Sequence, residues 1–203
     1  MKLRYSSTSP YVRKVTVTAL ECGLDDKIER ISTNTTDPDL LRDNPLAKVP
    51  ALVTDEGMAL CESPVICDYL DSLHQGDKLH PPAGPERWRA LNLAALADGV
   101  MDAAILRIQE LRLRPENKRS DKVVGMQKSK IAETLDLLES KAAAGALDGQ
   151  VTIGELALAC ALGYLDFRFG DDAWRTGRPA LTAWYEKISQ RPSLQATVPQ
   201  DPA

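Results

Sequence analysis

For a chain of 203 residues, the sequence is poor in histidine, cysteine and aromatic side chains, and this excludes several kinds of site. Its two histidines, His74 and His80, are expected to have no other metal ligands beside them, although a zinc site needs several. The cysteines show no Cys-x-x-Cys spacing. We therefore expect no metal centre. The cysteines also show no disulfide-rich spacing, so we expect buried free thiols in a reducing cytosol. They are Cys22, Cys61, Cys67 and Cys160.

Long apolar runs and an excess of positive charge are absent too. The chain has 25 Lys and Arg against 29 Asp and Glu, which argues against a nucleic-acid partner. The Arg-rich end of one predicted helix, including Arg107, Arg112 and Arg114, is interpreted as a solvated face. No apolar run is long enough to cross a membrane, and residues 1–5 lack the core of a signal peptide. We therefore expect a cytoplasmic protein without a membrane partner.

What is present in the first 80 residues is an alternation of strand and helix patterns. Ser9-Pro10 is a typical helix start, with Ser as N-cap and Pro at the first helical position. A strand, a helix and a strand of this length predict a βαβ unit with parallel strands. A hairpin and a second Ser-Pro helix start then complete a βαβ-ββα order, which predicts a thioredoxin-like α/β domain. The expected strands are residues 2–5, 27–31, 51–54 and 58–61, and the expected helices begin at Ser9, near residue 37 and at Ser63.

The second half shows helical patterns alone. Residues 77–85, rich in Pro and Gly, are the expected linker between a domain at 1–76 and an all-α helical bundle at 86–203. Thr152 and Glu155 have the spacing of a capping box. The helix that they begin is almost wholly apolar, so other helices must surround it. The expected helices are 85–114, 121–144, 152–167 and 179–190.

The stretch from Val49 to Ser63 carries the best indication of a binding site. Proline cannot donate to a sheet ladder, so Pro50 is expected at a strand start, with a cis peptide bond as a minority alternative. The amide and carbonyl of Val49 then stay free for another partner. We interpret this stretch as a peptide-binding edge, with Glu62 and Ser63 beside it as a polar clamp.

These residues resemble the glutathione S-transferase family, over nearly the whole chain. Asn44-Pro45-Leu46-Ala47-Lys48-Val49-Pro50-Ala51-Leu52 is similar to the family's segment before the third strand. Glu62-Ser63 before an apolar helix resembles its γ-glutamyl-binding turn, and Thr152-Ile153-Gly154-Glu155 resembles the capping box of its central helix. Ser9-Pro10-Tyr11-Val12-Arg13-Lys14 is similar to a bacterial subgroup whose first helix begins with Ser-Pro.

The resemblance implies an enzyme that activates the thiol of glutathione, with glutathione as co-substrate and no metal. Ser9 is then the catalytic residue, because its hydroxyl and the first-turn amides can stabilise the thiolate. The alternative is that Ser9 is only an N-cap and that Tyr5, Ser7 or Thr8 supplies the hydroxyl. Cysteine precedes the proline in related subgroups, so serine here disfavours thiol transfer through a protein thiol and leaves conjugation or peroxide reduction.

The resemblance also assigns the glutathione-binding residues. Glu62 pairs with the γ-glutamyl ammonium, and Ser63 with its helix-start amides binds the carboxylate. The backbone of Val49 pairs with the cysteinyl part, and Lys48 reaches the glycine carboxylate. The alternative is that Ser63 is only an N-cap and Glu62 only a favourable charge near a helix N-terminus. For Lys48, the alternative is an ordinary exposed lysine that binds nothing.

The second substrate, an electrophile or a hydroperoxide, is expected between the two domains. Asp98, Met101 and Ile105 can line that wall, or they can be core residues and a buried structural carboxylate. Cys61 and Cys67 are expected to be buried packing residues. The resemblance further implies a homodimer. The alternative function is a non-catalytic module that binds glutathione or another protein with the same fold.

Overall fold

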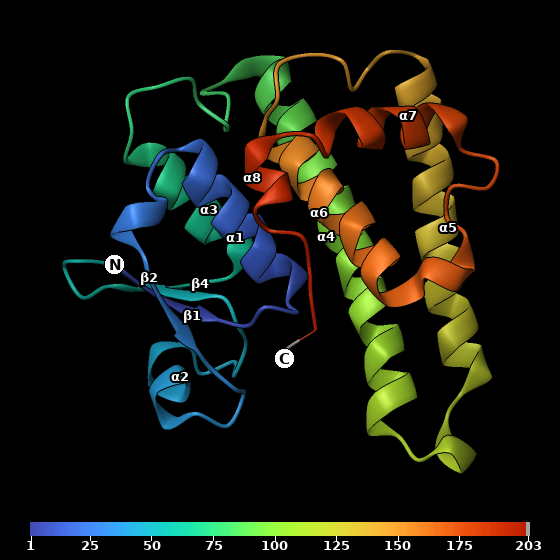
Figure 1. The fold of residues 1–203 in the computed structure, drawn as a ribbon, viewed down its shortest axis with the longest axis horizontal. Helices are drawn as coiled ribbons and strands as arrows, with labels where there is room; N and C mark the ends of the chain where they lie inside the picture. The colour runs from blue at the N-terminus through green and yellow to red at the C-terminus, as the bar shows by residue number, and fades with distance from the viewer. Residues whose placement is uncertain (202–203) are drawn as a thin grey trace.

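A four-stranded mixed sheet organises the first third of the chain in the computed structural model, which describes residues 1–201 (Figure 1). The strand order is β2-β1-β3-β4. As predicted, β1 runs parallel to β2, and β3 and β4 form an antiparallel hairpin. In addition, β3 runs antiparallel to β1. The second strand begins two residues later than predicted, because a short 3₁₀ turn occupies Asp25–Lys27. The strands are β1 (Lys2–Tyr5), β2 (Glu29–Ser32), β3 (Ala51–Val53) and β4 (Ala59–Cys61).

Three helices cover this sheet. Figure 1 shows α1 (Pro10–Glu21) and α3 (Ser63–Ser72) on one face and α2 (Pro38–Asp43) on the other. The buried side of α1 is rich in valine, and α3 packs beside it with Ile66 and Leu70 fully buried. The predicted βαβ-ββα order is therefore confirmed.

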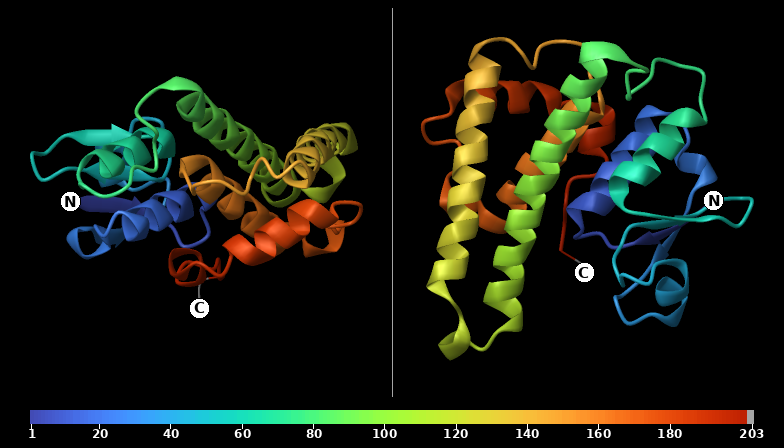
Figure 2. Two further views of the ribbon diagram at one scale, coloured as in Figure 1. Left: turned by 90° about the horizontal axis from the view of Figure 1, so that it is seen from above. Right: turned by 180° about the vertical axis from the view of Figure 1, so that it is seen from behind.

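The second half contains only helices, as predicted. Figure 2 shows from two further sides that they stand beside the sheet layer. Among the described residues, no helix is long and apolar enough to cross a membrane. Residues 202 and 203, the last two of the predicted helical domain, lie outside the described part of the chain. The helices are α4 (Gly84–Leu113), α5 (Asp121–Ala143), α6 (Ile153–Phe169), α7 (Pro179–Ile188) and α8 (Pro192–Gln195), with 3₁₀ turns at Glu116–Lys118 and Gly170–Asp172.

The helix α6 forms the centre of this half. Every residue from Ile153 to Leu165 is buried, which an almost wholly apolar sequence requires. Its predicted capping box is present: Glu155 Oε2 accepts from the backbone N–H of Thr152 at 2.8 Å, and the Thr152 hydroxyl accepts from Gly154 N at 3.2 Å. Both buried polar residues are thereby satisfied at the helix start.

The interpretation of the arginine-rich end of α4 as a solvated face is wrong for Arg107. Its side chain is 4% exposed and pairs with Asp172 at 2.6 Å. Its guanidinium also lies 3.8 Å from the centre of the Phe169 ring. The sequence pattern did not reveal this contact, because Asp172 and Phe169 lie more than 60 positions away in the chain.

Candidate functional site

Three segments singled out in the sequence meet at one edge of the sheet. The strand register aligns Arg4, Ala51 and Cys61 in one row across β1, β3 and β4. Just beyond this row, β1 leads toward Ser9, and the segment before β3 arrives through Val49-Pro50. β4 ends beside them and leads into Glu62. Antiparallel pairing of β3 with its two neighbours thus gathers residues that are up to 53 positions apart.

The segment before β3 presents a backbone without ladder partners. No backbone hydrogen bond within residues 1–201 engages Val49, and the Val49–Pro50 peptide bond is cis. The preceding residue, Lys48, is fixed by a hydrogen bond: the Asn44 side chain donates to its carbonyl at 2.8 Å. Pro50 is buried, Val49 is half-buried and the Lys48 side chain is exposed. The amide and carbonyl of Val49 are therefore available at this edge, as expected.

At the start of α3, the predicted cap is displaced by one residue. Glu62, not Ser63, occupies the N-cap position, and Ser63 is the first helical residue. Glu62 has φ +67°, a backbone conformation that is uncommon for residues other than glycine. Its side chain is exposed, while Ser63 is only 2% exposed. The Glu62 carboxylate is therefore exposed to solvent, whereas Ser63, at the first turn of α3, is buried.

Ser9 is the N-cap of α1, as predicted. Its Oγ accepts from the backbone N–H of Val12 at 3.3 Å, and the residue is half-buried. Capping uses a lone pair of the hydroxyl, so the hydroxyl proton stays available for a second partner. Of the alternative hydroxyls, Thr8 lies 3.4 Å from Ser6 Oγ, and Ser7 is exposed.

A set of polar contacts between α1 and α4 was missed in the sequence. The hydroxyl of Tyr11 donates to Asp102, and Lys14 pairs with Asp98 at 2.6 and 2.8 Å. Burial raises the pKa of Tyr11, and Asp102 adds to that rise. Burial also raises the pKa of Asp98 against the opposing charge of Lys14, and the charges of Asp102 and Glu62 add to that rise. The sequence spacing could have indicated these contacts. Tyr11 and Lys14 are three residues apart and so share a face of α1, and Asp98 and Asp102 are four residues apart and share a face of α4.

The structure shows which of the α4 residues expected to line the second-substrate site are instead part of the core. Asp98 is the partly buried structural carboxylate of the Lys14 ion pair. Met101 is fully buried in the core, so it does not line a wall, while half-buried Ile105 packs against the core. Of the three candidate residues of α4, Ile105 alone can still either line the second-substrate site or pack in the core.

The two cysteines near the site differ from each other. Cys67 is fully buried, accepts from the Thr18 hydroxyl at 3.3 Å, and has its pKa raised to about 11 by burial. Cys61 is only half-buried, so the expectation of a buried packing residue is wrong there. Cys61 is the last residue of β4, and β4 is the outermost strand on its side of the sheet. This position explains its exposure.

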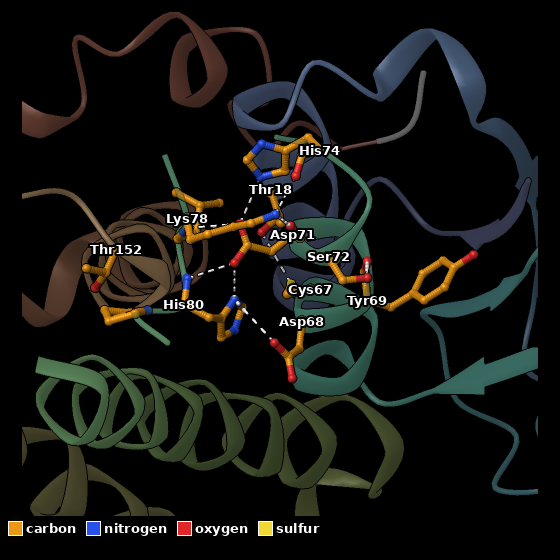
Figure 3. Close-up of polar contacts among 12 residues, drawn as sticks. Thr18, Cys67, Asp68, Tyr69, Asp71, Ser72, His74, Lys78, His80 and Thr152 are labelled. Atoms are coloured by element: carbon orange, nitrogen blue, oxygen red, sulfur yellow. Dashed lines mark hydrogen bonds and ion pairs between the residues drawn. The ribbon is translucent and has the colours of Figure 1, made fainter. Parts of the chain in front are cut away.

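The expectation that the histidines lack ligand-type neighbours is also wrong. Ligand atoms of Cys22, Asp71 and His74 lie within 4.8 Å of one another. Figure 3 shows how the Asp71 carboxylate is engaged: it accepts from His74 Nε2 and the N–H of Leu79 at 2.9 Å each, and from His80 N and Nδ1 at 2.9 and 3.2 Å. Burial raises the pKa of Cys22 to about 12. The cluster is a hydrogen-bonded link between α3 and the segment that follows it.

The chain is similar to known proteins along nearly its whole length. Residues 8–73 match the model of the glutathione S-transferase N-terminal domain, and residues 86–187 match that of its C-terminal domain. The chain is 36% identical over 200 residues to the "Uncharacterized GST-like protein YibF" of Escherichia coli, with 98% of each chain covered.

Two similar solved structures are of a glutathione transferase family member from Pseudomonas fluorescens, with bound glutathione in one and bound S-(propanoic acid)-glutathione in the other. Both are 46% identical to this chain and cover 98% of it, with 98% and 100% of their own chains covered and TM-scores of 0.94 and 0.91. The fold is thus a small thioredoxin-like sheet unit followed by a helical unit. The chain belongs to the glutathione S-transferase family.

Proposed function

We propose that this protein is a glutathione transferase that binds glutathione at the sheet edge, stabilises its thiolate and directs it to a second substrate. The observation that carries the proposal is the meeting of Ser9, Val49 and Glu62 just beyond one row of the strand register. A tripeptide needs backbone pairing and partners for its charged groups, and this edge offers both.

Each end of glutathione has a partner in this arrangement. The exposed carboxylate of Glu62 pairs with the γ-glutamyl ammonium, and the hydroxyl of Ser63 with the first amides of α3 binds the neighbouring carboxylate. The free amide and carbonyl of Val49 pair with the cysteinyl residue as a short added strand. Lys48, exposed at the same edge, reaches the glycine carboxylate.

Ser9 stabilises the sulfur. A free thiol has a pKa near ~8.5, and lowering it by about two units takes roughly 2.7 kcal/mol of preference for the thiolate. One hydroxyl donor and the positive end of α1 are of the right size for this task. Because the cap uses a lone pair, the proton of Ser9 is available to the sulfur while Val12 N–H stays capped.

The second substrate is a small electrophile or a hydroperoxide. The relative with bound S-(propanoic acid)-glutathione supports a site that accommodates glutathione with a substituent on its sulfur. Conjugation forms such products, whereas thiol transfer requires a cysteine where this chain has Ser9. We place this activity in the cytosol, in a homodimer.

The second candidate function is a non-catalytic module that binds glutathione or another protein with the same fold. The feature that favours it is Ser9 in its capping role, since an N-cap needs no catalytic purpose. Turnover, rather than binding, separates the two functions.

The test compares Ser9→Ala with Ser9→Thr. We expect Ser9→Ala to lower kcat/KM for a generic aryl halide by roughly 10–100-fold, because a donor to developing negative charge is lost. The pKa of bound glutathione, read from the pH dependence of the rate or from thiolate absorbance, should rise. Ser9→Thr keeps both hydroxyl and cap and should retain most activity.

Alanine also removes the cap, which costs about 1 kcal/mol, so urea unfolding must show that Ser9→Ala is folded. Equal rates for the folded Ser9→Ala variant and the natural protein would exclude Ser9 as the activating residue. Calorimetry without any uptake of glutathione by the natural protein would exclude the proposed function itself.

A further inference from the structure

Arg13, in the first turn of α1, is a buried cation without a carboxylate partner. It is 8% exposed, and no carboxylate within residues 1–201 forms an ion pair with it. The other buried arginine and lysine side chains of the described residues each have one: Arg4 pairs with Asp43, Lys14 with Asp98 and Arg107 with Asp172. Because a buried charge is costly unless it is paired, Arg13 retains the capacity to bind an anion.

The partners of Arg13 are neutral groups at and after α8. Nη2 donates to the carbonyl of Leu194 at 3.1 Å, and Nε donates to the hydroxyl of Thr197 at 3.4 Å. The second distance is long for an N–H···O hydrogen bond, so this bond is weak. The third nitrogen, Nη1, lies against Gly163 of α6 and has no partner in the described chain. An acceptor oxygen beside Thr197 can therefore take over the Nε donor.

Arg13 and Thr197 line the same cavity, which has a volume of about 330 Å³. Its walls include α1, the end of β1 with the loop after it, and the residues that follow α8. Figure 1 shows the residues after α8 running beside α1 toward that loop. Val49, Glu62 and Ser63 do not line this cavity, so it is separate from the proposed glutathione site. The volume is at the lower end for small-molecule sites and restricts the ligand to a small one.

Thr16 is a second polar residue of the cavity wall that lacks a partner. It lies one turn after Arg13 on the same face of α1 and is 6% exposed, and its Oγ1 has no hydrogen-bond partner among residues 1–201. The neighbouring buried threonine, Thr18, differs, because its hydroxyl donates to the Lys14 carbonyl at 2.9 Å. A buried hydroxyl without a partner is costly. A water molecule would satisfy Thr16 alone, whereas an anion satisfies Thr16 and also the charge of Arg13.

The charges and apolar groups of the cavity wall define the class of anion. The lining contains the guanidiniums of Arg13 and Arg30 and one carboxylate, that of Asp25, which pairs with Arg30. Two positive charges against one negative charge leave an excess of one, which suits a monoanion. Val12 and Leu20 add an apolar surface. A carboxylate offers two oxygens to a guanidinium and a hydroxyl, and a short apolar chain matches the rest of the wall.

We propose that this cavity is a binding site for a small monocarboxylic acid, held by Arg13 and Thr16. One carboxylate oxygen accepts from Nε of Arg13 and the other accepts from the Thr16 hydroxyl. The short carbon chain of the acid packs against the apolar surface of α1. The bound acid thereby supplies the negative charge that the fold itself does not place beside Arg13.

The experiment measures dissociation constants by NMR titration of the isotope-labelled protein. Propionate is the probe, and propionamide is its neutral counterpart of nearly the same shape. The ionic strength is constant, and saturating glutathione blocks the proposed glutathione site. We expect propionate to bind roughly tenfold more tightly than propionamide, with the largest shifts at Arg13, Thr16 and residues 196–198. Inorganic phosphate should bind more weakly than propionate, because it makes no contact with the apolar surface.

Thr16→Val is the decisive variant, and Thr18→Val is its matched control, since both replace a buried threonine of α1 by a residue of nearly the same shape. Thr16→Val should weaken propionate binding by roughly tenfold. The free Thr16→Val protein should be at least as stable as the natural one in urea, because no hydrogen bond is lost. Thr18→Val should bind propionate normally but unfold at a lower urea concentration. Arg13→Lys, which keeps the charge without the planar fork, should bind propionate more weakly than the natural protein.

Equal affinity of the natural protein for propionate and propionamide would overturn the proposal, as would unchanged propionate binding by Thr16→Val. Tighter binding of phosphate would overturn the carboxylic acid as the ligand class. Displacement of propionate by glutathione would place the acid at the glutathione site and overturn the separate cavity site. Should Arg13→Lys not fold, the comparison of Thr16→Val with Thr18→Val decides the question. No readout requires turnover, and the same titrations without glutathione test the cavity even if the proposed function fails.

Discussion

At the scale of single residues, Glu62 combines an exposed carboxylate with a left-handed backbone. Its φ of +67° costs a non-glycine residue on the order of 1–3 kcal/mol, and such residues gather at binding sites. The register of β3 and β4 holds this turn beside Val49. The conformation is therefore maintained by its surroundings, and it places the carboxylate at the end of the proposed glutathione site.

We expect Glu62→Gln to weaken glutathione binding by roughly tenfold, because a charged hydrogen bond to the ammonium becomes a neutral one. Calorimetry with glutathione measures the change, and the backbone turn is unaffected by this isosteric substitution. The control is Glu56→Gln, which removes an exposed carboxylate from the β3–β4 turn. Unchanged affinity in Glu62→Gln would remove Glu62 from the site.

At the scale of elements, α4 and α6 approach each other closely at Gly154. A Cβ on Gly154 would lie 2.7 Å from the carbonyl oxygen of Ala90 and 2.9 Å from Leu93 Cβ. Neither neighbour is the end of a flexible side chain, so the two helices would have to separate. Gly154 is also the second residue of α6, inside its capping box, where a shift disturbs Thr152.

We expect Gly154→Ala to lower the free energy of unfolding by about 1–3 kcal/mol through overpacking. Gly99→Ala is the matched control in α4, since nothing lies within 4 Å of its Cβ position. That variant should gain about 0.5–1 kcal/mol, because alanine favours the helix interior. Urea unfolding measures both, and a stabilised Gly154→Ala would contradict the close approach.

Most elements could be predicted because their signals are local. Ser9-Pro10 and the Thr152–Glu155 box fixed two helix starts correctly, and alternation with turn residues located the hairpin. The N-cap of α3 was misassigned by one residue, because the left-handed conformation of Glu62 depends on the sheet rather than on its neighbours in sequence. The burial of Arg107 was missed for a similar reason, since its partner comes from a distant turn.

At the scale of the whole molecule, Asp71 joins the two halves of the chain. Its carboxylate, on α3, accepts from the backbone of Leu79 and His80 in the connecting segment (Figure 3). The carbonyl of Leu79 in turn accepts from Ile153 N at 2.9 Å, at the start of α6. The sequence could not predict this path, because it consists of side chain-to-backbone contacts that leave no periodic pattern.

The same geometry explains a pH dependence. Burial alone would raise the pKa of Asp71, but hydrogen bonds from Leu79, His80 and His74 hold it below its usual value. A carboxyl with a lowered folded-state pKa stabilises the fold fully above its unfolded-state pKa, near ~3.9. That contribution is lost as the pH falls through the lower pKa of the folded state.

We therefore expect Asp71→Asn to lower the free energy of unfolding at neutral pH by roughly 1.5–3 kcal/mol, since charged hydrogen bonds to buried donors are lost. The difference between this variant and the natural protein should shrink as the pH falls below about 4, where the natural carboxyl becomes protonated. Urea unfolding between neutral and acidic pH measures both curves. The control, Asp68→Asn, changes a largely exposed carboxylate 3.8 Å from His80 and should give a far smaller effect. A constant difference across the acid range would show that Asp71 acts through packing rather than through its charge.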